Sequence, residues 1–278
     1  MNLQLKSKLA SAAARPFLAK GRASLAFTLI ELLIVVVIIA VLATIGLPAL
    51  RGFGSTNAIA AANRQILDDL AEARLRAINQ RSTVYVVFIP PQIASYNWNA
   101  LTIDERKQLT NLINGQFTSY NFFSRRSLGD QPGQDNPRYL SEWKHLPEGI
   151  FIATNKFVDN WDMTKWNVVN TNRAFAYTMI PFPTATNRPV LMPYVAFDYR
   201  GQLLSSSGDP FIPYRLDEEI IPLAQGSVIY PINPDGSYKL AAAEAIETPR
   251  NNSTNNRVHI DWLTGRARVV IPSLELPL

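Results

Sequence analysis

The sequence predicts an α+β protein in which a long N-terminal helix packs on an antiparallel, β-rich globular domain. An apolar run over residues 27–50 continues into a helical pattern that lasts to residue 80. From residue 83 the pattern changes to short β-branched and aromatic runs, and the chain contains 19 prolines. Short runs of this kind are typical of antiparallel sheets with long loops. We therefore divide the chain into a leader (1–26), a long helix (27–80) and a β-rich domain (81–278).

The leader carries the whole net charge of the chain. Residues 1–26 contain five basic residues and no acidic one, whereas the full chain has 27 basic and 22 acidic residues. The remainder therefore balances 22 basic against 22 acidic side chains. A basic segment before an apolar run stays in the cytoplasm and directs the following chain across the membrane. We expect a cytoplasmic N-terminus with the globular domain on the other side.

The apolar run over residues 27–50 is long enough to cross a bilayer. Its 24 residues span about 36 Å as a helix. Sixteen of them are Leu, Ile, Val or Phe, which favour insertion by about 5–10 kcal/mol. Glu31 opposes insertion by only about 2.5–3.5 kcal/mol, so we predict a transmembrane helix. A charge inside a membrane usually has a partner and a function.

The second half of the helix has one apolar face. Apolar residues recur at steps of three and four, and they are Ile59, Ala62, Ile66, Leu70, Ala73 and Ala77. Glu72 and Arg76 form a favourable i,i+4 pair. Between the two halves, Pro48 and the glycines of residues 46–54 weaken the helix. We expect the apolar face to pack on the globular domain.

Residues 83–89 read as a strand because they are β-branched and aromatic and are followed by two prolines. Residues 92–140 are rich in Asn, Gln and Ser and look like an insertion into a smaller core. Within them, Thr102 and Glu105 fit a capping box at the start of a short helix, which Gly115 ends. Residues 129–137 read as a loop.

The start of the apolar run resembles a known signal. The residues Ala26-Phe27-Thr28-Leu29-Ile30-Glu31 are similar to the class III signal of type IV pilins and type II secretion pseudopilins. The resemblance implies cleavage between Ala26 and Phe27 by a prepilin peptidase, followed by N-methylation of Phe27. Position 26 is alanine where the family usually has glycine. Pro48 falls where the family places a helix-weakening proline.

The resemblance also implies a role for Glu31. Cleavage would create an amine at Phe27, and Glu31 could then pair with the amine of its own or a neighbouring subunit in a low-dielectric setting. The implied partners are other pilin or pseudopilin subunits and an inner-membrane assembly platform. The implied location is a single pass through the inner membrane by residues 27–50, with a periplasmic domain that enters a filament after processing.

A second resemblance covers the C-terminal half. Residues 146–150 (Leu-Pro-Glu-Gly-Ile), 197–201 (Phe-Asp-Tyr-Arg-Gly) and 264–269 (Thr-Gly-Arg-Ala-Arg-Val) are similar, in this order, to the GspH/FimT branch of pilin-like proteins. Residues 260–268 also resemble the Verru_Chthon cassette D group. Residues 92–140 fall outside the pattern. The implied function is a minor pilin or pseudopilin, a structural subunit or initiator of a type II secretion pseudopilus or type IV pilus-like filament.

Two other functions stay open at this point. Some FimT-like minor pilins are thought to bind DNA through a Gly-Arg-x-Arg element, and residues 265–268 match it. Arg266 and Arg268 are two apart, so a strand would present both on one face. Phosphate contacts need clustered cations, however, and the chain after the leader is neutral. The other alternative is a simple membrane-anchored or secreted β-domain protein.

Catalysis finds little support in the sequence. The chain has no cysteine and only two histidines, and no catalytic or phosphate-binding motif is present. We read His259 as part of a solvated strand face. Residues 217–219 (Asp-Glu-Glu) read as a solvated charge run in preference to a cation site. We therefore expect neither catalysis nor a metal or cofactor.

Overall fold

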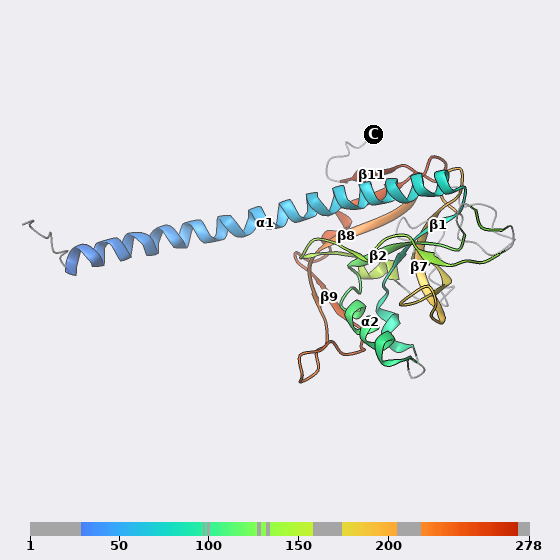
Figure 1. The fold of residues 1–278 in the computed structure, drawn as a ribbon. Helices are drawn as coiled ribbons and strands as arrows, with labels where there is room; N and C mark the ends of the chain where they lie inside the picture. Colours follow the sequence, from blue (N-terminus) through green and yellow to red (C-terminus); the bar gives the residue numbers. More distant parts are fainter. Residues whose placement is uncertain are drawn as a thin grey trace, which may run out of the picture. The chain divides into compact units, whose positions relative to one another are not determined.

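The computed structural model describes residues 29–271 except 97, 99–100, 127–128, 132–133, 158–173 and 205–217, and of residues 43–56 the backbone alone. The chain forms two compact units, residues 1–50 and 51–278. Helix α1 (Leu29–Gln80) begins in the first unit and ends in the second. Figure 1 shows this helix and the strands of the second unit. The predicted α+β class, with an N-terminal helix and an antiparallel β-rich domain, is confirmed.

The part of α1 in the second unit buries the predicted apolar face. Ala62, Ile66, Leu70, Ala73 and Ala77 are each at most 2% exposed. They belong to the main hydrophobic core. The 3.6-residue period of the sequence therefore places one side of this helix segment in the core of its own unit.

Two antiparallel sheets make up most of the second unit. The first sheet has the order β3-β2-β1-β7-β6, with β4 also paired to β2. Its strands are β1 (Val84–Phe88), β2 (Ser119–Ser124), β3 (Arg138–Tyr139), β4 (Lys144–His145), β6 (Ala176–Pro181) and β7 (Pro189–Phe197). The second sheet has the order β11-β10-β8-β5, with β9 also paired to β8. Its strands are β5 (Ile150–Ile152), β8 (Glu219–Ile229), β9 (Glu244–Glu247), β10 (Arg257–Ile260) and β11 (Ala267–Val270).

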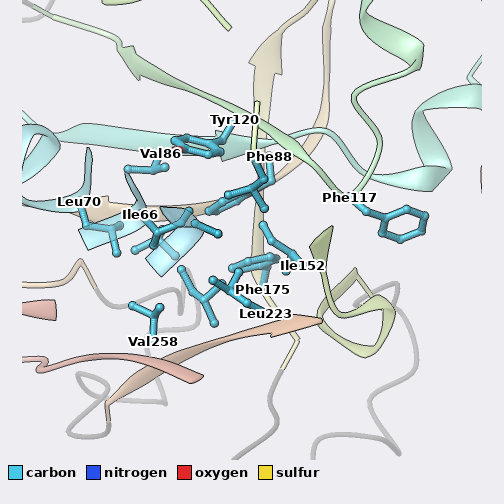
Figure 2. Close-up of a cluster of buried hydrophobic side chains, with 14 of the residues drawn as sticks. Ile66, Leu70, Val86, Phe88, Phe117, Tyr120, Ile152, Phe175, Leu223 and Val258 are labelled. Atoms are coloured by element: carbon cyan, nitrogen blue, oxygen red, sulfur yellow. The ribbon is translucent and has the colours of Figure 1, made fainter. Parts of the chain in front are cut away.

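The main core lies between α1 and both sheets. Figure 2 shows Ile66 and Leu70 of α1 with Val86 and Phe88 of β1. Leu223 of β8 and Val258 of β10 belong to the same buried cluster. The core thus joins elements that are nearly 200 residues apart in the sequence.

A second core covers the other face of the first sheet. Val87 and Ile89 point away from the neighbours Val86 and Phe88, as the two-residue period of a strand requires. They pack with residues of the short helix η1 (Pro91–Ser95) and of α2 (Ile103–Ile113). Leu109 and Ile113 supply the apolar side of α2. Both faces of this sheet are therefore buried.

The predicted capping box of α2 is confirmed. The Thr102 side chain accepts the backbone N–H of Glu105, and the Glu105 carboxylate accepts the backbone N–H of Thr102. The helix ends at the C-cap Asn114, directly before Gly115. Strand β2 lies in the same segment, 92–140, and the sequence analysis missed it. Tyr120 and Phe122 of β2 belong to the main core, so this segment is more than a surface elaboration.

Candidate functional site

The predicted processing residues, Ala26 and Phe27, lie outside the described residues. Glu31 stands in the first turn of α1 and is exposed. A carboxylate in the first turn is favoured because the backbone N–H groups there give the helix a positive end. Pro48 lies within α1, and the helix continues through it; its side chain is not among those described.

The first turns of α1 present apolar side chains on every side. All side chains from Leu29 to Leu42 are exposed, with Leu29 at 83% and Leu42 at 64%. Glu31 is the one ionisable group in this stretch. A helix that is apolar all round is normally covered by protein or lipid. Within the described part of the chain, no helix met the length and hydropathy required of a membrane span.

A polar network attaches one flank of α1 to the first sheet. Asp69 accepts hydrogen bonds from the Tyr120 hydroxyl and from Lys144 Nζ, each at 2.5 Å. Lys144 also contacts Glu72 at 3.0 Å, and Arg76 Nη2 donates to Glu72 at 2.5 Å. The predicted Glu72–Arg76 pair is therefore confirmed as part of a larger network. Sequence reasoning missed its other members because they come from β2 and β4.

The network shifts the pKa values of its members. Burial opposes the ionised form of Glu72, but hydrogen bonds from Lys144 and Arg76 outweigh it and lower its pKa. Burial likewise opposes the charged form of Lys144, and its two carboxylate partners raise its pKa above the usual value. Burial and the neighbouring Asp69 raise the pKa of Tyr120. The network therefore holds charged, paired groups at neutral pH.

Arg74 attaches the other flank of α1 to two turns. Its Nε donates to the carbonyl oxygen of Thr264 at 2.7 Å and to that of Gly201 at 3.1 Å. Gly201 has φ +79° and Gly265 has φ +63°. A Cβ on Gly265 would lie 2.1 Å from the Gly201 carbonyl oxygen. Two pieces of the C-terminal sequence pattern, residues 197–201 and 264–269, therefore meet at α1.

An aspartate organises each of these turns. Asp198 Oδ1 accepts the backbone N–H groups of Arg200 and Gln202 at 2.8 and 3.0 Å. Asp261 Oδ1 accepts both the hydroxyl and the backbone N–H of Thr264, which lowers the pKa of Asp261. Side chains of this type favour turns because they bond to the backbone a few residues ahead. The pattern residues thus have a structural role in shaping and docking the two turns.

The two arginines of the predicted DNA-binding element are both exposed. Arg266 precedes β11, and Arg268 lies within it. Arg268 Nη2 donates to Glu218 Oε1 at 2.9 Å, and Glu218 Oε2 lies 2.7 Å from Nδ1 of His259. Burial opposes the charged form of Glu218, but its hydrogen bonds with His259 and Arg268 outweigh this and lower its pKa. An arginine bound to a carboxylate contributes less to an electropositive surface for phosphates.

Two predictions for this region need correction. The His259 side chain is only 14% exposed, so it is largely covered and does not lie on a solvated face. Glu219 belongs to β8 and is 5% exposed. It pairs with Lys156, whose ammonium lies 4.9 Å from the centre of the Phe175 ring. Glu219 is therefore part of a buried ion pair and not of a solvated charge run.

Comparison with known proteins identifies the N-terminal signal. Residues 21–47 match the family described as the prokaryotic N-terminal methylation motif. The chain therefore carries a type IV pilin-like prepilin signal. No curated protein and no solved structure matches the chain.

The match has several consequences for the predictions. The signal implies anchoring of the N-terminus in a membrane, processing by a prepilin peptidase and assembly with other pilins. Proteins with this signal are structural and not enzymatic.

The part of the chain that the structure describes holds no group of three or more His, Cys, Asp or Glu residues suited to a metal ion.

Proposed function

We propose that this protein is a minor pilin or pseudopilin, a structural subunit or initiator of a type II secretion pseudopilus or a type IV pilus-like filament. One observation carries the proposal. The methylation motif at residues 21–47 coincides with the start of a helix that is apolar all round and has Glu31 in its first turn. A basic leader precedes this helix, and a folded β-rich unit follows it.

In this proposal, processing creates a new cationic partner for Glu31. A prepilin peptidase cleaves between Ala26 and Phe27, and the new amine of Phe27 is methylated. The amine and Glu31 are then one helical turn apart, and a neighbouring subunit can offer its own amine to the same carboxylate. A carboxylate in a low-dielectric setting is costly without such a partner. The pair would therefore set the register of subunits in a filament.

The exposed apolar side chains of residues 29–42 support membrane anchoring. Covering such a surface with lipid or with other helices removes it from water at a gain of about 25 cal/mol per Å². We propose that residues 27–50 cross the inner membrane once, with residues 1–26 in the cytoplasm and residues 81–278 in the periplasm. Other subunits would cover the same helix after the chain enters the filament.

The globular unit supports a structural role through its attachment to α1. Asp69 and Glu72 bind Lys144 of the first sheet on one flank, and Arg74 binds the turns at Gly201 and Thr264 on the other. These bonds anchor the last turns of α1 within its own unit. A subunit that is assembled through its helix needs such an attachment to carry its domain.

The proposal is tested by replacing the charge at position 31. Glu31→Gln keeps the size of the side chain and removes its charge, whereas Glu31→Asp keeps the charge. We expect Glu31→Gln to enter the membrane and to be cleaved, but to be depleted from the sheared filament fraction. Glu31→Asp should be present in the sheared filament fraction in a larger amount than Glu31→Gln. Equal assembly of both variants and the unchanged chain would remove the role proposed for this charge.

A further inference from the structure

Strand β9 forms an unusual edge of the second sheet. It pairs with the C-terminal part of β8, with Ser227 opposite Ile246 and Ile229 opposite Glu244. No other pairing of β9 occurs among the described strands. Ile229 is 51% exposed and Ile246 is 43% exposed. Opposed residues share a face of the ribbon, so Ile246 of the edge strand and Ile229 of β8 lie on the same face, together with Glu244 and Ser227. An exposed isoleucine on an edge strand is unusual, because edges normally carry polar residues.

The hydrogen bonds around β9 show which of its backbone groups face outward. Thr248 donates its backbone N–H to Gln225 of β8 at 2.8 Å. Ala243 donates its backbone N–H to the Gln116 side chain on the other side. Because the direction alternates along a strand, the N–H and C=O groups of Ala245 and Glu247 point away from β8. These are the groups that a further strand would bind.

We propose that β9 pairs with β9 of a second copy of this chain, antiparallel and about a two-fold axis at Ile246. Ala245 of one copy then lies opposite Glu247 of the other, and these residues exchange their outward N–H···O bonds. The two Ile246 side chains meet at the axis in a non-hydrogen-bonded pair, where side chains are closest. The two ribbons become one four-stranded sheet, in which Ile246 at the axis and Ile229 on the next strand are diagonal neighbours on one face.

Charge and hydrogen bonding select this register over the other two-fold pairings of the strand. An axis at Glu244 or at Glu247 would place like charges directly opposite each other, which is destabilising. An axis at Ala245 would need the N–H of Ala243, which Gln116 already accepts. The axis at Ile246 places Glu244 opposite Thr248 and Glu247 opposite Ala245. Repulsion between like charges therefore disfavours the registers centred at Glu244 and Glu247, but not the register centred at Ile246. Because β9 can pair with itself in this register, we take a second copy of β9 as the partner.

The absence of cysteine from the sequence allows a direct test by cross-linking. The full chain with Ile246→Cys, purified in detergent, is treated with a mild oxidant and run on a non-reducing gel. Residues opposed in a non-hydrogen-bonded pair have Cα atoms about 4.5 Å apart, which is within the range of a disulfide. We expect a covalent dimer. Ile229→Cys is the register control, because it lies on the same face one strand further from the axis and should not cross-link.

A third variant controls for random collision, and light scattering gives an independent readout. Ile103→Cys is on α2, is 86% exposed and should stay monomeric on the gel. The unmodified chain should be a dimer in light scattering, and Ile246→Lys should convert it to a monomer while Ile103→Lys does not. Equal cross-linking of the three cysteine variants, no cross-linking of Ile246→Cys, or a monomeric unmodified chain would overturn the proposal. None of these results depends on cleavage at Phe27, so the filament proposal is judged separately.

Discussion

A close approach of two backbone segments in the globular unit gives a sharp prediction about its stability. Gly265 has φ +63°, a conformation that costs a residue with a side chain about 1–2 kcal/mol. A Cβ at this position would also lie 2.1 Å from the carbonyl oxygen of Gly201, a backbone atom that cannot rotate away. Overpacking of this kind typically costs a further 1–3 kcal/mol. We therefore expect Gly265→Ala to lower the free energy of unfolding by about 2–5 kcal/mol.

A matched variant separates the two contributions. Gly236 has φ +83°, and a Cβ there would meet no atom within 4 Å. Gly236→Ala should therefore show only the conformational cost of about 1–2 kcal/mol. The assay is urea unfolding of residues 55–278, with the slope of the transition checked for each variant. If Gly265→Ala were no more destabilising than Gly236→Ala, the docking of the two turns described above would be wrong.

Three further predictions concern α1 and the C-terminal hairpin. Arg74→Met should lower the free energy of unfolding of residues 55–278 by about 1–3 kcal/mol in urea unfolding, because hydrogen bonds from a charged donor to two carbonyls are lost. The control is Arg64→Met, at an exposed position of the same helix. A smaller decrease in the free energy of unfolding for Arg74→Met than for Arg64→Met would contradict this prediction. The pKa of Glu72 is lower in the folded chain than its usual value of 4.5. The ionised side chain therefore contributes to the free energy of unfolding above about pH 4.5, and this contribution is lost as the pH falls through the lower, folded pKa. In unfolding curves measured from about pH 7 to about pH 3, the free energy of unfolding of Glu72→Gln should therefore depend less on pH than that of the unchanged chain. Residues 55–278 should show no salt-sensitive retention of DNA on a filter, because Arg268 binds Glu218; retention that Arg266→Ala abolishes would restore the DNA-binding alternative.

The parts of the fold that the sequence predicted are those set by local patterns. The apolar face of α1 follows from residue spacing, and the start of α2 follows from Thr102 and Glu105. The turn glycines at positions 201 and 265 also stand out, because a positive φ favours glycine. Each of these signals lies within a few residues of the element that it defines.

The parts that sequence reasoning missed depend on distant partners. Strand β2 is entirely buried although half of its residues are polar, since Asn121 and Ser124 find hydrogen bonds with Ser141 and with the carbonyl of Thr83. The pair of Lys156 and Glu219 joins residues 63 apart in the sequence. A local pattern cannot tell such polar residues from solvated ones, because their partners are brought together only by the fold.

The N-terminus of the mature protein tests the central claim most directly. The full chain is expressed with a prepilin peptidase, extracted from the membrane, and its first residues are determined by mass spectrometry of the N-terminal peptide. We expect a chain that begins at Phe27, with a methyl group on its amine. An intact Met1 would contradict this expectation. So would a start at Thr44, because Ala43 is a small residue of the kind after which a secretory signal is cleaved.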